Sequence, residues 1–154
     1  MQRVSVQVAP ALARRTRERP SPASASTSAL LRRAARSALA DSADSSDAEL
    51  SITLLDDQGI ADLNQQWLKH AGPTDVISFP LYGDDESVVG DIYIGYDQVV
   101  RQARENAVSV REELARVAIH GTLHILGYDH PEGVARLRSS MWRRQERILH
   151  GVMG

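Results

Sequence analysis

The 154-residue chain contains no cysteine, so it has neither disulfide bonds nor thiolate ligands. Any metal site must therefore be built from His, Asp or Glu side chains. The chain also lacks an apolar run long enough to span a membrane, so no membrane partner is expected. Together with 25% charged residues, these absences are typical of a soluble globular domain, and we expect a cytoplasmic protein.

Charge is distributed unevenly along the chain, although the formal net charge is only −2. Residues 1–40 carry eight Arg and one Glu, whereas residues 41–97 carry thirteen acidic residues and a single Lys. Residues 98–154 are basic again, with nine Arg and six acidic residues. This polarity could place a basic surface near an acidic ligand such as RNA. Arg-rich helices that expose a solvated face would give the same pattern, and composition does not separate the two interpretations.

Short apolar segments with strand character alternate irregularly with helical patterns. Strands are predicted at about residues 3–8, 50–55, 76–79 and 88–94. Because the regular alternation of a parallel-sheet fold is absent, we expect an α+β fold. It would have a mixed sheet of about four strands packed against a central buried helix, with about five helices in all. The length suits a single domain over residues 1–154, with an irregular loop at 10–28.

Polar residues mark where the helices are expected to begin. Thr27 or Ser28 can cap a helix that runs to about residue 40, and Ser109 with Glu112 forms a capping box for the central helix. A polar linker is expected at 41–47 and an acidic turn at 82–87. Pro131 suits the first turn of a closing helix, and the apolar residues expected to form its buried side are Val134, Leu137, Met141 and Ile148.

Three of the five histidines lie within eleven residues, as His120, His124 and His130. On a helix, positions i and i+4 share a face, so His120 and His124 can hold one ion between them. Gly127 can then adopt the left-handed conformation that ends a helix, which could return His130 to the same ion. Three imidazoles with one open position are typical of a catalytic zinc site. The alternative is that these are ordinary core or surface histidines without a ligand role. Three histidines at ligand spacing favour the metal site over that alternative.

The chemistry of such a site depends on what surrounds the histidines. Zinc peptidases share the i, i+4 histidines but place a Glu directly after the first, and here that position is Gly121. A peptidase of that type would lack its base. A phosphodiester is a better candidate substrate, because RNA supplies its own 2′-hydroxyl and its cleavage needs positive charge around the phosphoryl oxygens. Arg116, one turn before His120, is the best basic candidate, unless it is a solvated helix residue.

The stretch from His120 to His130, HGTLHILGYDH, resembles the signature of the YbeY family of zinc-dependent endoribonucleases, also called ribosomal RNA maturation factors. Three further stretches agree with that family in content and order. They are Leu63-Asn64, the segment PTDVISFP at 73–80, and Gly90-Asp91-Ile92. The resemblance covers about residues 50–150, and residues 1–48 match only in the order of a strand followed by a helix.

The resemblance implies one zinc ion per chain, with His120, His124 and His130 as its ligands. It also implies cleavage of single-stranded RNA, processing of the 3′ end of small-subunit ribosomal RNA, and ribosome quality control. The implied partners are ribosomal RNA and the ribosome or a ribosomal protein, with no DNA expected. Many members carry an Arg before the Pro-Thr-Asp stretch, where this chain has Leu68 followed by Lys69. Lys69 could supply that charge, but without the bidentate geometry of Arg.

Two other functions remain open at this point. The protein could be a zinc-containing ribosome-assembly factor that binds RNA or a ribosomal protein without cleaving RNA. It could also be a different zinc hydrolase acting on an ester or amide. Trp67 and Trp142 could stack on bases, but their helical spacing indicates core or edge packing first. No general acid or base is recognisable from the sequence.

Overall fold

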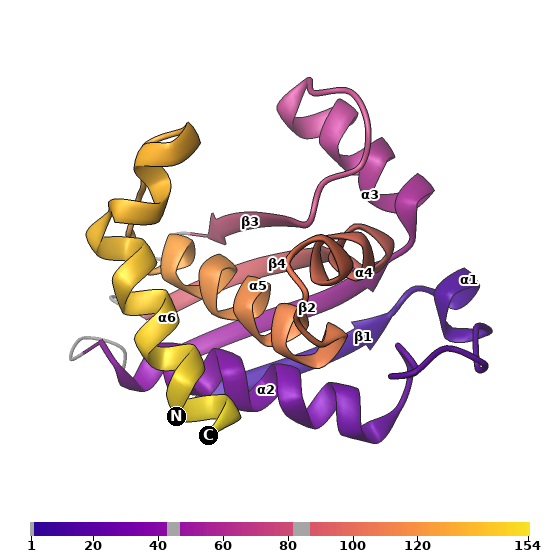
Figure 1. Cartoon of the computed structure of the whole chain (residues 1–154), viewed down its shortest axis with the longest axis horizontal. Helices are drawn as coiled ribbons and strands as arrows, with labels where there is room; N and C mark the ends of the chain where they lie inside the picture. The colour runs from indigo at the N-terminus through magenta and orange to yellow at the C-terminus, as the bar shows by residue number, and fades with distance from the viewer. Residues whose placement is uncertain (1, 43–46, 82–86) are drawn as a thin grey trace.

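A four-stranded mixed sheet lies at the centre of the computed structural model, which describes residues 2–42, 47–81 and 87–154 (Figure 1). The strand order is β1-β2-β4-β3, with β1, β2 and β4 parallel and β3 antiparallel to β4. This confirms the predicted α+β fold with a mixed sheet. The strands are β1 (Gln2–Val8), β2 (Ala48–Leu55), β3 (Val76–Leu81) and β4 (Val88–Gly95).

The helices differ in length, and two segments have non-α geometry. The longer helices match the predicted set in order, while the short α1 was not predicted. In the described part of the chain the helices are α1 (Pro10–Ala13), α2 (Ala25–Ala40), α3 (Asp57–Leu63), the π-helical η1 (Asn64–Leu68), α4 (Tyr96–Glu105), α5 (Val110–Ile125), the 3₁₀-helical η2 (Gly133–Arg138) and α6 (Ser140–Met153).

The start of α2 corrects the predicted cap. Ser24, rather than Thr27 or Ser28, caps the helix by accepting a hydrogen bond from the backbone N–H of Thr27 at 3.1 Å. The Thr27 side chain is fully buried and donates to the carbonyl oxygen of Ser21. The irregular segment predicted at 10–28 is therefore shorter, because α1 occupies its beginning and α2 its end.

The closing helix also begins later than predicted. Ser139 has an extended backbone (ψ 156°) and caps α6 through the N–H of Trp142, so η2 and α6 are separate helices. Met141 and Ile148 are buried as predicted. Val134 and Leu137 are 73% and 49% exposed, which contradicts their assignment to the buried side. The polar linker expected at 41–47 and the acidic turn expected at 82–87 lie mostly outside the described residues.

Helix α5 occupies the centre of the fold, as predicted. It contacts α2, α4 and α6 and lies on β3 and β4, and ten of its sixteen residues are buried. Two glycines allow this close approach: a Cβ on Gly121 would lie 3.0 Å from Cγ2 of Ile92, and one on Gly90 would overlap Ile125. Ser78 of β3 also donates a hydrogen bond to the carbonyl oxygen of Gly121 at 3.1 Å. The sheet therefore fixes how closely α5 approaches it and how α5 is rotated about its own axis.

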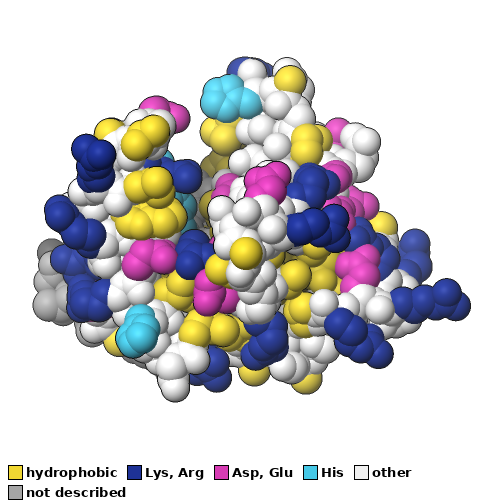
Figure 2. All heavy atoms as spheres, in the orientation of Figure 1, with side chains coloured by type: hydrophobic (Ala, Val, Ile, Leu, Met, Phe, Trp, Pro, Cys, Tyr) yellow, Lys and Arg dark blue, Asp and Glu magenta, His cyan; other side chains and the backbone are white. Residues whose placement is uncertain are grey.

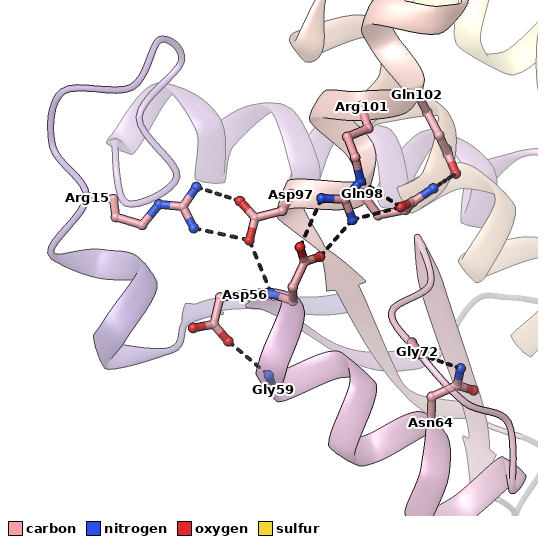
Figure 3. A network of polar contacts seen from close by, with 10 residues as sticks. Arg15, Asp56, Gly59, Asn64, Gly72, Asp97, Gln98, Arg101 and Gln102 are labelled. Carbon is pink, nitrogen blue, oxygen red and sulfur yellow. Dashed lines mark hydrogen bonds and ion pairs between the residues drawn. The ribbon is translucent and has the colours of Figure 1, made fainter.

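A polar network joins the segment after β1 to α3 and α4 (Figure 3). Arg15 donates to both carboxylate oxygens of Asp97, and Arg101 does the same to Asp57. The hydrogen bonds from Arg15 hold the pKa of Asp97 below its usual value. Because each cation is matched by a carboxylate, this cluster acts as a structural clamp on the segment that follows β1. None of the helices in the described ranges combines the length and apolar character of a membrane span.

Replacing Gly95 should destabilise the protein, because a Cβ there would overlap the carbonyl oxygen of Thr74. The N–H of Gly95 also donates to the carbonyl oxygen of Asp75 at 2.8 Å, so the backbone cannot simply move away. We expect Gly95→Ala to lower the free energy of unfolding by about 1–3 kcal/mol in urea titrations. Gly151→Ala is the matched control, since nothing lies within 4 Å of a Cβ at that helical position. Equal urea midpoints for Gly95→Ala and wild type would contradict this account.

Candidate metal centre

The last turns of α5 present His120 and His124 on one side of the helix. The helix then ends in a Schellman motif, in which the N–H of Gly127 bonds the carbonyl oxygen of His124 and the N–H of Tyr128 bonds that of Leu123. Gly127 has φ +101°, the left-handed conformation that glycine adopts without strain. The prediction that Gly127 closes the helix and lets the chain return is therefore confirmed.

The returning chain brings His130 to the two helical histidines. The ring centroid of His130 lies 5.0 Å from that of His120 and 5.0 Å from that of His124. One nitrogen from each of the three rings lies within 4.8 Å of the others, so this group could hold a metal ion. Figure 2 shows histidine atoms inside a hollow between the surface over η2 and α6 and the surface over α3 and η1.

Hydrogen bonds to Nδ1 decide which nitrogen of each ring is available. His120 Nδ1 lies 2.6 Å from Oε1 of Gln145, and His124 Nδ1 lies 3.0 Å from the carbonyl oxygen of Tyr128. His130 Nδ1 lies 3.0 Å from the carbonyl oxygen of Pro131. All three partners are acceptors, so each Nδ1 carries the proton and each Nε2 keeps its lone pair. The three rings are thus in the tautomer that ligates a metal through Nε2.

The spacing and electrostatics of the Nε2 atoms suit a cation. Nε2 of His120 lies 3.1 Å from Nε2 of His124, so two lone pairs face each other and repel without a positive charge nearby. A tetrahedral ion with bonds of about 2.0–2.1 Å would hold such nitrogens about 3.3 Å apart. Burial lowers the pKa of His120 to about 4 and lowers that of His124, so both rings are neutral at pH 7. The donor set therefore fits a divalent metal such as zinc.

Arg116 lies behind the histidines, within a cluster of carboxylates. Its guanidinium contacts Glu112, Glu113 and Glu146, and its side chain is only 17% exposed. The cluster matches the charge of Arg116 with more than one negative group. We therefore interpret Arg116 as a partner of these carboxylates, whereas the sequence had suggested a basic group facing the substrate.

Lys69 lies on a different element, at the end of η1. It has φ +58°, and its exposed ammonium group donates to the carbonyl oxygen of Gln66 at 3.2 Å. The buried Asn64 fixes this loop, because its side chain donates to the carbonyl oxygen of Gly72 at 3.0 Å (Figure 3). Trp67 is 61% exposed and meets Phe79 edge to face at 6.2 Å. Trp67 thus packs on β3 while most of its surface remains in water.

Gln145 is a member of the site that sequence reasoning missed. It is 1% exposed and lies on α6, between the buried Met141 and Ile148. The sequence feature that could have identified it is a polar residue at a position where the helix pattern places an apolar, buried one. Its partner could not be deduced, because α6 and α5 are brought together only by tertiary packing.

Comparison with known proteins agrees with the motif and with the fold. The family model for endoribonuclease YbeY matches residues 14–153. Endoribonuclease YbeY of Moorella thermoacetica is 41% identical over 133 residues, covering 79% of this chain and 84% of that protein. That of Aquifex aeolicus is 46% identical over 88 residues, covering 55% and 58%. The solution structure of TM1509 from Thermotoga maritima is similar with a TM-score of 0.63 and 28% identity, covering 100% of this chain and 90% of that one.

The family match extends well beyond the resemblance drawn from residues 50–150, because it includes most of the N-terminal third as well as all three histidines. The identity to the Moorella protein extends over most of both chains. The resemblance inferred from the sequence is therefore confirmed, and the chain belongs to the endoribonuclease YbeY family.

Proposed function

We propose that this protein is a zinc-dependent endoribonuclease that cleaves single-stranded RNA, matures the 3′ end of small-subunit ribosomal RNA and takes part in ribosome quality control. The observation that carries the proposal is that His120, His124 and His130 each bring one ring nitrogen within 4.8 Å of the others, while each Nδ1 faces a hydrogen-bond acceptor. These residues would hold one zinc ion per chain and leave a coordination position open. Family membership supplies the RNA-cleaving chemistry.

Zinc held by the three neutral imidazoles would keep its full charge and would supply Lewis acidity toward the phosphoryl oxygens of the substrate. The protein's own part is to keep His120 and His124 uncharged by burial and to hold each Nδ1 proton on an acceptor. Gly121 packs against β3 and β4, so the position where a zinc peptidase carries its Glu faces the sheet. This supports cleavage of RNA, whose 2′-hydroxyl supplies the nucleophile.

The proposed partners are ribosomal RNA and the ribosome or a ribosomal protein, and the proposed location is the cytoplasm. A polyanionic partner suits the basic residues of the N-terminal third and of the last third of the chain. The absence of cysteine is compatible with the same location. We propose no membrane or DNA partner.

Removing one ligand should abolish both zinc binding and RNA cleavage. We expect wild type to bind one zinc per chain, and His124→Ala to lose the zinc and lower cleavage of single-stranded RNA by at least about 100-fold, since ligand loss removes the Lewis acid. Metal analysis, RNA cleavage and circular dichroism on the same preparations measure zinc, activity and folding. His150→Ala, at an exposed position of α6, is the matched control and should retain both properties.

A folded, zinc-free His124→Ala protein that cleaves RNA as fast as wild type would contradict the proposed function. Wild type that binds zinc and RNA but cleaves no RNA would instead favour an assembly factor. Complementation of a deletion strain separates these cases further. Rescue of ribosomal RNA processing by His124→Ala would indicate a binding role without cleavage.

The neutral state of His120 should make the metal-free protein sensitive to acid. Its pKa is about 4 in the folded protein, against about 6.5 in the unfolded chain. Between these values the unfolded chain binds a proton that the folded protein does not, so the free energy of unfolding should fall as the pH is lowered from 6.5 to 4. Urea titrations of chelator-treated protein measure this slope. His120→Asn should have a shallower slope, and equal slopes would contradict the assignment.

We propose that Lys69 contacts the RNA backbone, because its charge is exposed on the loop after η1. We expect Lys69→Ala to raise the KM for RNA about fivefold, equivalent to about 1 kcal/mol of binding, with zinc content unchanged. Lys69→Arg should keep or improve the KM, since it retains the charge and adds a bidentate donor. An unchanged KM in Lys69→Ala at low salt would exclude the contact.

A further inference from the structure

The three candidate ligands are held in their tautomers by different kinds of acceptor. His124 and His130 donate to backbone carbonyl oxygens of Tyr128 and Pro131, which belong to the same turn. These acceptors come with the local backbone and do not depend on side-chain identity. His120 instead donates to a side chain of another helix, Oε1 of Gln145 at 2.6 Å. Of the three candidate ligands, His120 is therefore the one whose orientation can be changed by substituting a single side chain.

The amide of Gln145 has only one orientation that satisfies its neighbours. Its Nε2 donates to Oε2 of Glu146 at 3.1 Å, and this carboxylate accepts a hydrogen bond from Nε of Arg116 at 3.0 Å. A flipped amide would place its oxygen against the carboxylate and its N–H groups against the ring. Oε1 must therefore face His120, and the ring must place its proton on Nδ1.

This arrangement continues through the interior as a chain of hydrogen bonds. Arg116 also pairs with the buried Glu113, which accepts from Nε2 of Gln102 at 3.0 Å. The same Nε2 of Gln102 lies 3.2 Å from Oδ2 of Asp75, in the segment before β3. Side chains of α6, α5 and α4 thus brace the amide that holds His120. A partly buried network in which each member has a hydrogen-bond partner resists rotation of its members.

We propose that Gln145 is a positioning residue, which holds His120 in the Nδ1-protonated tautomer with Nε2 directed at the metal. This inference rests on the proposed zinc site. Because the Gln145 amide is neutral, it orients the ring without adding negative charge beside the ion. The acceptor behind a metal-bound histidine contributes about 10–100-fold to metal affinity in other proteins.

The first measurement uses metal-free protein and is independent of activity. Long-range ¹H–¹⁵N correlation spectra of histidine-labelled protein at pH 7 report which nitrogen of His120 carries the proton. Wild type should show the Nδ1–H form alone, and Gln145→Leu should show a mixture or the Nε2–H form. Met141→Leu is the matched control, a change at another fully buried position of α6, and should leave the His120 signals unchanged.

The second measurement is zinc affinity by competition with a chelator. Gln145→Leu should raise the zinc dissociation constant about 10–100-fold. Gln145→Glu keeps an acceptor of the same length for Nδ1 of His120 and leaves the pair between Arg116 and Glu146 unchanged. It should recover the Nδ1–H tautomer and most of the affinity. If Gln145→Leu fails to fold, Gln145→Met, which keeps the length of the side chain, takes its place.

An unchanged His120 tautomer and unchanged zinc affinity in a folded Gln145→Leu protein would overturn the inference. So would a folded Gln145→Glu protein that binds zinc no better than Gln145→Leu. If wild type itself binds no zinc, the proposed function fails, while the spectra of metal-free protein still decide whether Gln145 sets the tautomer. The two failures are therefore distinguishable.

Discussion

The packing of α5 on the sheet is the constraint from which the rest of the site follows. Gly121 and Gly90 let the helix and β4 approach without intervening side chains, and Ser78 bonds the carbonyl oxygen of Gly121. One side of α5 thus packs on the sheet, and other sides contact α2, α4 and α6. The half-buried side that carries His120 and His124 faces the hollow seen in Figure 2. Burial then removes water from the imidazoles and keeps them neutral. One packing arrangement thus sets both the direction and the charge state of the candidate ligands.

Behind the histidines, the mostly buried charge of Arg116 helps to orient His120. Arg116 is surrounded by Glu112, Glu113 and Glu146, so its charge is compensated within the protein. Its hydrogen bonds extend through Glu146 to Gln145 and so to His120. Removing one of these carboxylates would leave the mostly buried Arg116 with less compensation for its lost hydration. We interpret the cluster as a support for the histidines, a different role from the substrate-facing cation inferred from the position of Arg116 one turn before His120.

Errors in the predicted elements have a common physical cause. Thr27 and Ser28 are good capping residues, yet Ser24 caps α2 because the helix gains a turn by packing on the core and burying Thr27. Val134 and Leu137 fit a helical apolar pattern, yet both are exposed because the chain breaks at Ser139. Local propensity differs by only about 1 kcal/mol between such alternatives, so tertiary packing decides them.

The sequence by itself determined the strand and helix order, the central place of α5, and the three histidines with Gly127 as the turn between them. These features depend on local periodicity and backbone preference, which act over a few residues. Only the tertiary structure decided that Gln145 faces His120, that Arg116 belongs to a carboxylate cluster, and that α2 begins at Ala25. The contacts of Gln145 with His120 and of Glu146 with Arg116 join residues 25 and 30 positions apart, and the start of α2 depends on the burial of Thr27. A local pattern encodes none of these.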